Sequence, residues 1–202
     1  MYTGVNNILH SRLNTLSGFL AALPGVRSLT LYGSLADNRG DEYSDIDMAL
    51  DVSGTDNGVF LLELPEMLAR QYPVLYTDFA PSLAPEKYIL TAAVYPDNPF
   101  LLLDISVTAS PHCTAVTREM LAERNRLYTH TLKLFTANLK HSLRGLDCTG
   151  DIRKMVRRLP SPPPTDNMQV LLQYTHDWLT EYAEGDFVPY LLHFSPVMNT
   201  LR

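Results

Sequence analysis

Asp45 and Asp47, two aspartates separated by one residue, are the side chains in this sequence whose type and spacing most clearly indicate a reactive or metal-binding site. They lie in residues 44–52, where acidic or small residues alternate with Ile, Met, Leu and Val. Alternation of this kind predicts a β-strand with both carboxylates on one face and the apolar side chains on the other. Neighbouring carboxylates repel each other unless a cation lies between them, and Mg²⁺ prefers oxygen ligands. The pair predicts a divalent-metal site, although two solvated aspartates on an exposed strand have the same spacing.

A glycine and a serine, Gly33 and Ser34, follow an apolar segment at residues 26–32 that predicts a short buried strand. Glycine at such a strand end lets backbone N–H groups approach a phosphate closely, and serine adds a hydroxyl donor. A plain turn has the same composition. Here, however, the turn is followed by a polar loop over residues 35–43 and then by the two aspartates. The combination predicts a phosphate site beside a metal site.

A third carboxylate, Asp104, lies in the middle of a strongly apolar segment that also predicts a strand. A charge buried there without a partner costs several kcal/mol or loses its ionisation, and a metal ion would relieve that cost. Asp78 is the rival third acid, and Asp104 is preferred because its surroundings are more apolar. A hydrogen-bonded strand aspartate is the alternative reading of both.

Residues 31–50, LYGSLADNRGDEYSDIDMAL, resemble the nucleotidyltransferase superfamily typified by DNA polymerase beta. The resemblance is closest to its bacterial branch, which includes aminoglycoside nucleotidyltransferases and minimal antitoxin-type nucleotidyltransferases. The shared signature is an apolar residue, Gly-Ser, a loop, and an Asp-Xaa-Asp with apolar neighbours on the next strand. The match covers about a tenth of the chain.

The resemblance implies that Asp45, Asp47 and Asp104 are catalytic and hold Mg²⁺, as one or two ions, against a nucleoside triphosphate. It also implies that Gly33 and Ser34 seat the β- and γ-phosphates. Many relatives carry Ala-Arg-Gly after the Gly-Ser-Xaa, whereas Asp37 follows Ala36 here and the arginine comes later, as Arg39. Arg39 is therefore either a triphosphate contact or a solvated loop arginine.

The implied reaction is Mg-dependent transfer of a nucleoside monophosphate from the triphosphate to a hydroxyl of a small molecule, such as an aminoglycoside. The alternatives are an antitoxin-type or protein-modifying nucleotidyltransferase, and a non-catalytic nucleotide-binding or interaction module of the same fold. Glu86, Glu119 and Glu123 are candidates for a general base. Each of them also fits a solvated surface acid, because no motif surrounds it.

The elements that position these residues predict an α+β fold. The pattern indicates a unit with a mixed β-sheet over residues 1–110 and a helical region over residues 111–202. The resemblance implies that the first is the nucleotidyltransferase domain and that the helical region supplies the acceptor site. Helices are expected at 5–22, 58–71, 117–145, 151–159 and 165–183, and strands at 26–32, 44–52, 73–79, 87–95 and 100–108. A turn at residues 96–99 joins the last two strands into a hairpin.

The predicted helix at 117–145 carries two stripes of interest. Near one face lie four cationic residues, Lys133, Lys140, His141 and Arg144. We interpret them as a solvated surface, and contacts to phosphates are the alternative. Tyr128, Leu132 and Phe135 are interpreted as core rather than as a base-stacking platform. His112, His130, His141 and His176 show no metal-ligand spacing, which favours surface or packing roles.

Composition limits the partners. The 202-residue chain has a formal net charge of -6 and no run of Lys and Arg, which argues against a long nucleic acid. A cationic small molecule suits that balance better. Neither an apolar signal core nor a stretch of ~20 apolar residues is present, so no membrane span is expected. Two cysteines cannot form a disulfide framework, and a cytoplasmic location is expected.

Overall fold

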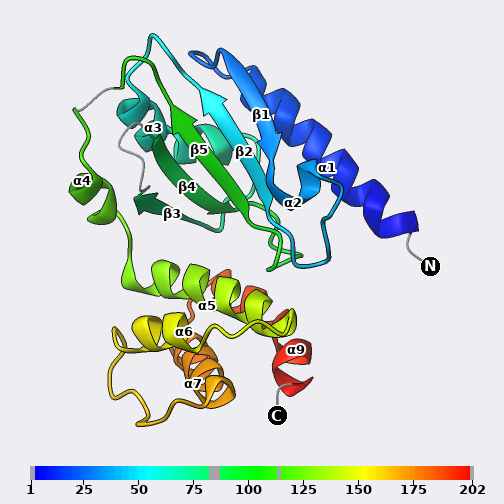
Figure 1. The fold of residues 1–202 in the computed structure, drawn as a ribbon, viewed down its shortest axis with the longest axis vertical. Coiled ribbons are helices and arrows are strands. Elements are labelled where there is room, and N and C mark those ends of the chain that lie inside the picture. The colour runs from blue at the N-terminus through cyan, green and yellow to red at the C-terminus, as the bar shows by residue number, and fades with distance from the viewer. Residues whose placement is uncertain (1–2, 82–86, 113–114, 201–202) are drawn as a thin grey trace.

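A five-stranded mixed β-sheet organises the N-terminal part of the chain (Figure 1). The computed structural model describes residues 3–81, 87–112 and 115–200. The strand order is β1-β2-β5-β4-β3, with β2 and β5 parallel and the other neighbours antiparallel. The strands are β1 (Ser28–Tyr32), β2 (Ile46–Asp51), β3 (Tyr76–Pro81), β4 (Lys87–Ala93) and β5 (Leu103–Thr108). The predicted hairpin is confirmed as the antiparallel pair β4–β5.

One face of the sheet is apolar and buried. The alternating residues Ile46, Met48 and Leu50 of β2 are fully buried in a core shared with β4 and β5. Helices α1 (Thr3–Ala21) and α3 (Asn57–Ala69) contribute buried leucines to the same core. Because side chains alternate along a strand, this packing leaves the aspartates of β2 on the opposite face.

A helical region lies at the end of the sheet where β2 and β5 begin (Figure 1). It contains α5 (Leu127–Leu143), α6 (Thr149–Val156), α7 (Met168–Glu181), α8 (Phe187–Leu192) and α9 (Ser195–Thr200). Leu132 and Phe135 are fully buried in a second core with α6, α7 and α8, which confirms their interpretation as core. The α+β fold class with a helical C-terminal region is likewise confirmed, and the division at residue 110 stays a prediction.

The single helix expected at 117–145 is wrong, since the structure has two helices there. Helix α4 (Arg118–Ala122) ends before residues 123–126, and α5 begins at Leu127. In the break, the Asn125 side chain accepts a hydrogen bond from the Phe79 N–H at 2.7 Å and donates one to the Phe79 carbonyl at 2.8 Å. Asn125 thus pairs with edge strand β3 as a neighbouring strand would, and this tertiary contact overrides the helical periodicity.

Replacement of Asn125 by alanine should therefore lower the free energy of unfolding by about 1–3 kcal/mol. Two backbone groups of β3 would lose their partner, and a half-buried group left unsatisfied costs that much. Urea unfolding would measure the change. Asn98 offers a control, because its side chain accepts from the N–H of Phe100, which is only two residues away. An Asn125→Ala variant no less stable than Asn98→Ala would contradict this role.

Other boundaries shift by a few residues. The loop expected at 35–43 begins instead within a one-turn helix, α2 (Gly33–Ala36), and Asp45 lies just before β2 rather than within it. Helix α7 begins at Met168 rather than at residue 165, and its cap is Asn167, whose side chain accepts from the N–H groups of Gln169 and Val170. Within the described residues, no helix is long and apolar enough to cross a membrane.

Candidate active site

Five polar residues lie side by side across the sheet, one on each strand. In strand order they are Tyr32, Asp47, Asp104, Thr91 and Asp78, each directly opposite the next. Residues in register share a face, and adjacent strands lie about 4.8 Å apart. We call these five residues the polar row. They lie on the face opposite the buried core, and three of the five are carboxylates.

Asp47 and Asp104 are direct neighbours at the centre of this row, on the parallel strands β2 and β5. Burial raises the pKa of Asp47 to about 6, and the negative charges of Asp104 and Asp45 add to the effect. The three aspartates singled out in the sequence are therefore close enough for their charges to interact. Their shared negative potential is what a bound cation would offset.

Asp45 precedes Asp47 and pairs with Lys140 of helix α5. Only 2% of the Lys140 side chain is exposed. Burial raises the pKa of Asp45, while the charge of Lys140 and its hydrogen bond act in the opposite direction. The buried ammonium of Lys140 thus already neutralises part of the negative charge of the three aspartates.

Gly33 lies close against the Asp47 side chain, in a backbone conformation that favours glycine. Its φ is +75°, and a Cβ added to it would lie 2.2 Å from Oδ2 of Asp47. Glycine meets both demands, since it adopts positive φ without strain and has no side chain. Helix α2 begins at this glycine, and the N–H groups of a first turn lack intrahelical partners. The predicted phosphate turn and the carboxylates are therefore adjacent.

Ser34 belongs to a chain of hydrogen bonds that joins this turn to helix α5. The Ser34 hydroxyl donates to Oγ of Ser44 at 3.0 Å, and the Ser44 hydroxyl donates to Asp41 at 2.9 Å. Both carboxylate oxygens of Asp41 accept from the Arg144 guanidinium, at 2.6 and 2.8 Å. The hydrogen bond from Arg144 holds the pKa of Asp41 well below its ordinary value. The loop between α2 and β2 is thus fixed to α5 at Asp41 and at Asp45.

Thr91 orients the third carboxylate. Its hydroxyl donates to Oδ1 of Asp104 at 2.5 Å, and Thr91 itself is buried. Partners that hold a metal-ligating carboxylate typically affect metal affinity by 10- to 100-fold. We therefore predict that Thr91→Val weakens Mn²⁺ binding in the presence of a nucleotide by roughly 10-fold, measured by calorimetry. Thr91→Ser keeps the hydroxyl and should bind Mn²⁺ as the wild type does. Equal weakening in both variants would show that only packing matters.

Asp78, the rival third acid, occupies a different environment. It is fully buried and paired with Lys133 and with Nδ1 of His130 at 2.8 Å. Burial raises its pKa, but the His130 hydrogen bond and the Lys133 charge outweigh burial and leave the pKa lowered. Asp78 lies two strands away from Asp104 in the polar row and has its own cationic partners. The geometry favours Asp104 as the companion of Asp47.

The interpretation of the α5 cations as a solvated face is wrong for Lys133 and Lys140, which are largely buried and pair with Asp78 and Asp45. Arg144 and His141 are exposed, and Arg144 pairs with Asp41. Residues 133 and 140 are about 10 Å apart along a helix at 1.5 Å per residue. That rise, with the reach of long lysine side chains, is enough to span from β3 to β2. Sequence alone could not assign these pairs, since their partners lie 55 to 103 residues away.

The remaining candidates lie elsewhere. The Arg39 side chain is 76% exposed and pairs with Asp37, so the structure does not bring it to the carboxylates. Glu119 and Glu123 are exposed on and beside α4, and Glu86 lies outside the described residues. His112 is within 3.2 Å of the Asn57 amide, and the His176 ring packs near Phe135, so both are placed in packing environments.

The three aspartates suit a hard cation by their chemistry. Their donor atoms are carboxylate oxygens, and burial together with their mutual repulsion raises the pKa of Asp47. Within residues 3–81, 87–112 and 115–200, no three His, Cys, Asp or Glu side chains are grouped closely enough to hold a metal ion. In this arrangement Asp45 is paired with Lys140, and Asp104 with Thr91. Their role as metal ligands stays a prediction.

Comparisons with known proteins give fold likenesses only. No protein-family model and no curated protein matches the chain. Among solved structures it is similar to the polymerase core of TRAMP, an RNA surveillance complex, with a TM-score of 0.45 and 15% identity over 91% of this chain and 61% of that one. It is also similar to a structure of the GLD-2/RNP-8 complex, with a TM-score of 0.38 and 14% identity over 97% and 57%. The chain spans about three fifths of each of these proteins.

Proposed function

We propose that this protein is a nucleotidyltransferase of the DNA polymerase beta-like superfamily. It transfers a nucleoside monophosphate from a nucleoside triphosphate, such as ATP, to a hydroxyl of a small molecule. One observation carries the proposal: Asp47 and Asp104 face each other on neighbouring strands, directly beside the positive-φ turn at Gly33. The sequence motif over residues 31–50 supports the same reading, because its two parts meet at this point.

In this proposal each residue has a defined task. Asp45, Asp47 and Asp104 hold Mg²⁺, which supplies charge neutralisation on the phosphates and activation of the acceptor hydroxyl. Gly33 gives the triphosphate close access to the backbone, and Ser34 contributes a hydroxyl donor. The protein contributes mainly positioning and electrostatics, since a rigid sheet fixes two of the carboxylates in register.

The proposal also specifies the chemical class of the acceptor and where it binds. The negative net charge of the chain fits a cationic small molecule, such as an amino sugar of the aminoglycoside kind. We place this acceptor beside the polar row, where α5 brings charged side chains to the sheet.

Incubation with α-labelled nucleoside triphosphates, Mg²⁺ and a panel of amino-sugar acceptors tests the proposal. We expect label on a small molecule, with no label in the Asp47→Asn variant. Label on the protein itself or on a co-purified protein would favour the protein-modifying alternative. Absence of any transfer, together with absence of nucleotide binding, would leave only a non-catalytic module of this fold.

A further inference from the structure

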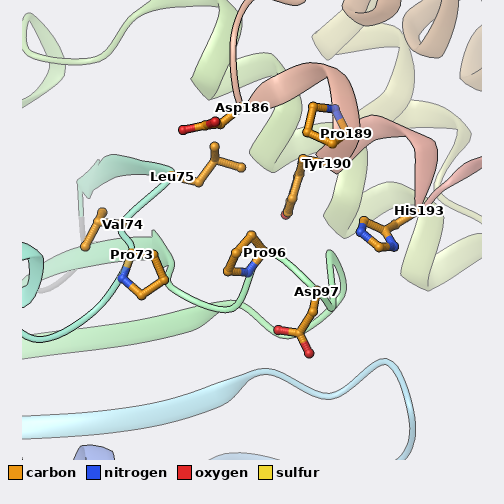
Figure 2. A pocket seen from close by; sticks show the side chains of 9 residues that line it. All are labelled: Pro73, Val74, Leu75, Pro96, Asp97, Asp186, Pro189, Tyr190 and His193. Carbon is orange, nitrogen blue, oxygen red and sulfur yellow. The ribbon is translucent and has the colours of Figure 1, made fainter.

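A preformed cavity lies at the rim of the sheet, apart from the phosphate turn (Figure 2). It has a volume of about 440 Å³, within the range of small-molecule sites. Its walls come from the segment that leads into β3, from the turn between β4 and β5, and from helix α8 with the residue after it: Pro73, Val74, Leu75, Pro96, Asp97, Asp186, Pro189, Tyr190 and His193.

The walls of this cavity are rigid. Three of the residues that line the cavity are prolines, whose rings fix the backbone φ angle. Tyr190 is 2% exposed, and its hydroxyl donates to the Pro99 carbonyl at 3.2 Å. Its ring also meets the rings of Tyr76 and Phe194 edge-on. A ligand would therefore find the apolar floor already in place and would need little rearrangement of the protein.

The charge around the cavity is negative. Figure 2 shows Asp186 and Asp97 on opposite sides, with Pro96 and Tyr190 between them. Asp97 is paired with Arg12 at 2.5 Å, so its charge is partly neutralised. Asp186 precedes α8 without capping it, and within the described residues no Lys or Arg pairs with it or lines the cavity. An apolar floor with one uncompensated carboxylate is complementary to an ammonium group on an apolar body.

The geometry points to a binding site for an organic cation in this cavity, with Asp186 as its counter-ion and Tyr190 and the three prolines around its apolar part. None of the residues that line the cavity is among those proposed to hold the nucleotide or the metal. Leu75 lies three residues before Asp78, about 10 Å along the strand, and Asp78 is itself two strands from Asp104. Binding here does not depend on nucleotidyl transfer.

Titration of the full chain with phenethylammonium tests this site, followed by amide NMR shifts at Leu75, Tyr190 and His193. The neutral isostere 2-phenylethanol is the matched ligand. Asp186→Asn is the test variant, and Glu184→Gln is the matched control, since Glu184 is an exposed acid two residues away that does not line the cavity.

We expect saturable shifts with the ammonium, binding at least roughly fivefold weaker for 2-phenylethanol and for Asp186→Asn, and an unchanged affinity for Glu184→Gln. Addition of Mg²⁺ and a nucleotide should leave the affinity unchanged. Equal binding of the neutral isostere, equal weakening by Glu184→Gln, or no binding of either probe would each overturn the assignment. Because no step requires catalysis, failure of the proposed function would not affect this result.

Discussion

Replacement of Asp47 by asparagine should abolish nucleotidyl transfer and at the same time stabilise the fold. We expect a loss of activity of roughly a thousandfold or more, because in the proposed function Asp47 would be a ligand of the Mg²⁺ that offsets the charge of the transition state. The stabilisation follows from the pKa of about 6, which shows that the folded protein resists ionisation of Asp47. Labelled-nucleotide transfer and urea unfolding measure the two effects.

The stability change has a defined pH dependence. Asp47 ionises near 3.8 in the unfolded chain and near 6 in the folded one, so wild-type stability falls as pH rises through this window. The advantage of Asp47→Asn should therefore be absent below pH 4 and constant above pH 6. At 1.36 kcal/mol per pKa unit, discounted for partial solvent screening, it should reach about 1 kcal/mol.

Asp51 provides the matched control for Asp47. It lies on the same strand and the same face, two positions beyond Ala49, and hydrogen bonds from Ser53 lower its pKa. Asp51→Asn should therefore keep the activity and should not stabilise the protein at any pH. A stabilising Asp51→Asn, or an active Asp47→Asn, would contradict the role given to the polar row.

Replacement of Lys133 by methionine should lower the free energy of unfolding by about 3 kcal/mol at neutral pH. Asp78 is fully buried, and loss of the ammonium leaves its charge with His130 alone. Breaking a buried ion pair on one side typically costs 3–5 kcal/mol, and the remaining His130 hydrogen bond places the effect at the lower end. Urea unfolding at neutral pH gives the value.

Two further variants separate the buried charge from lost packing. The double variant Asp78→Asn with Lys133→Met should recover most of the lost stability, since no uncompensated charge remains. Lys154→Met removes an exposed lysine paired with Asp151 and should change stability by less than about 0.5 kcal/mol. The Lys133→Met cost should also shrink below pH 4, where Asp78 can bind a proton. A cost that is independent of pH and unchanged in the double variant would refute the buried-charge explanation.

The placement of Asp47 and Asp104 on one face of the sheet could be predicted from the sequence because local rules determine it, whereas their role stays a prediction. Alternation along β2 and β5 places both residues opposite the buried core, and parallel pairing of these strands sets them side by side. The sequence indicated Gly33 as a close approach to a phosphate, which stays a prediction, and the structure places this glycine against Asp47.

The parts that the sequence did not predict depend on contacts between distant segments. Lys140 and Asp45 are 95 residues apart, and nothing in the sequence near Lys140 indicates that this lysine is buried and paired with an aspartate. Similarly, the break between α4 and α5 arises where Asn125 binds the edge of β3, although the apolar periodicity continues through it. Helical patterns report which face is apolar, but they do not report which charge a polar side chain will meet.

Calorimetric titration with a non-hydrolysable ATP analogue, with and without Mg²⁺, tests most directly whether the polar row is a nucleotide–metal site. We predict binding to the wild type that depends on Mg²⁺, and loss of that dependence in the double variant Asp47→Asn with Asp104→Asn. Binding of equal affinity without Mg²⁺, or in the double variant, would contradict the account.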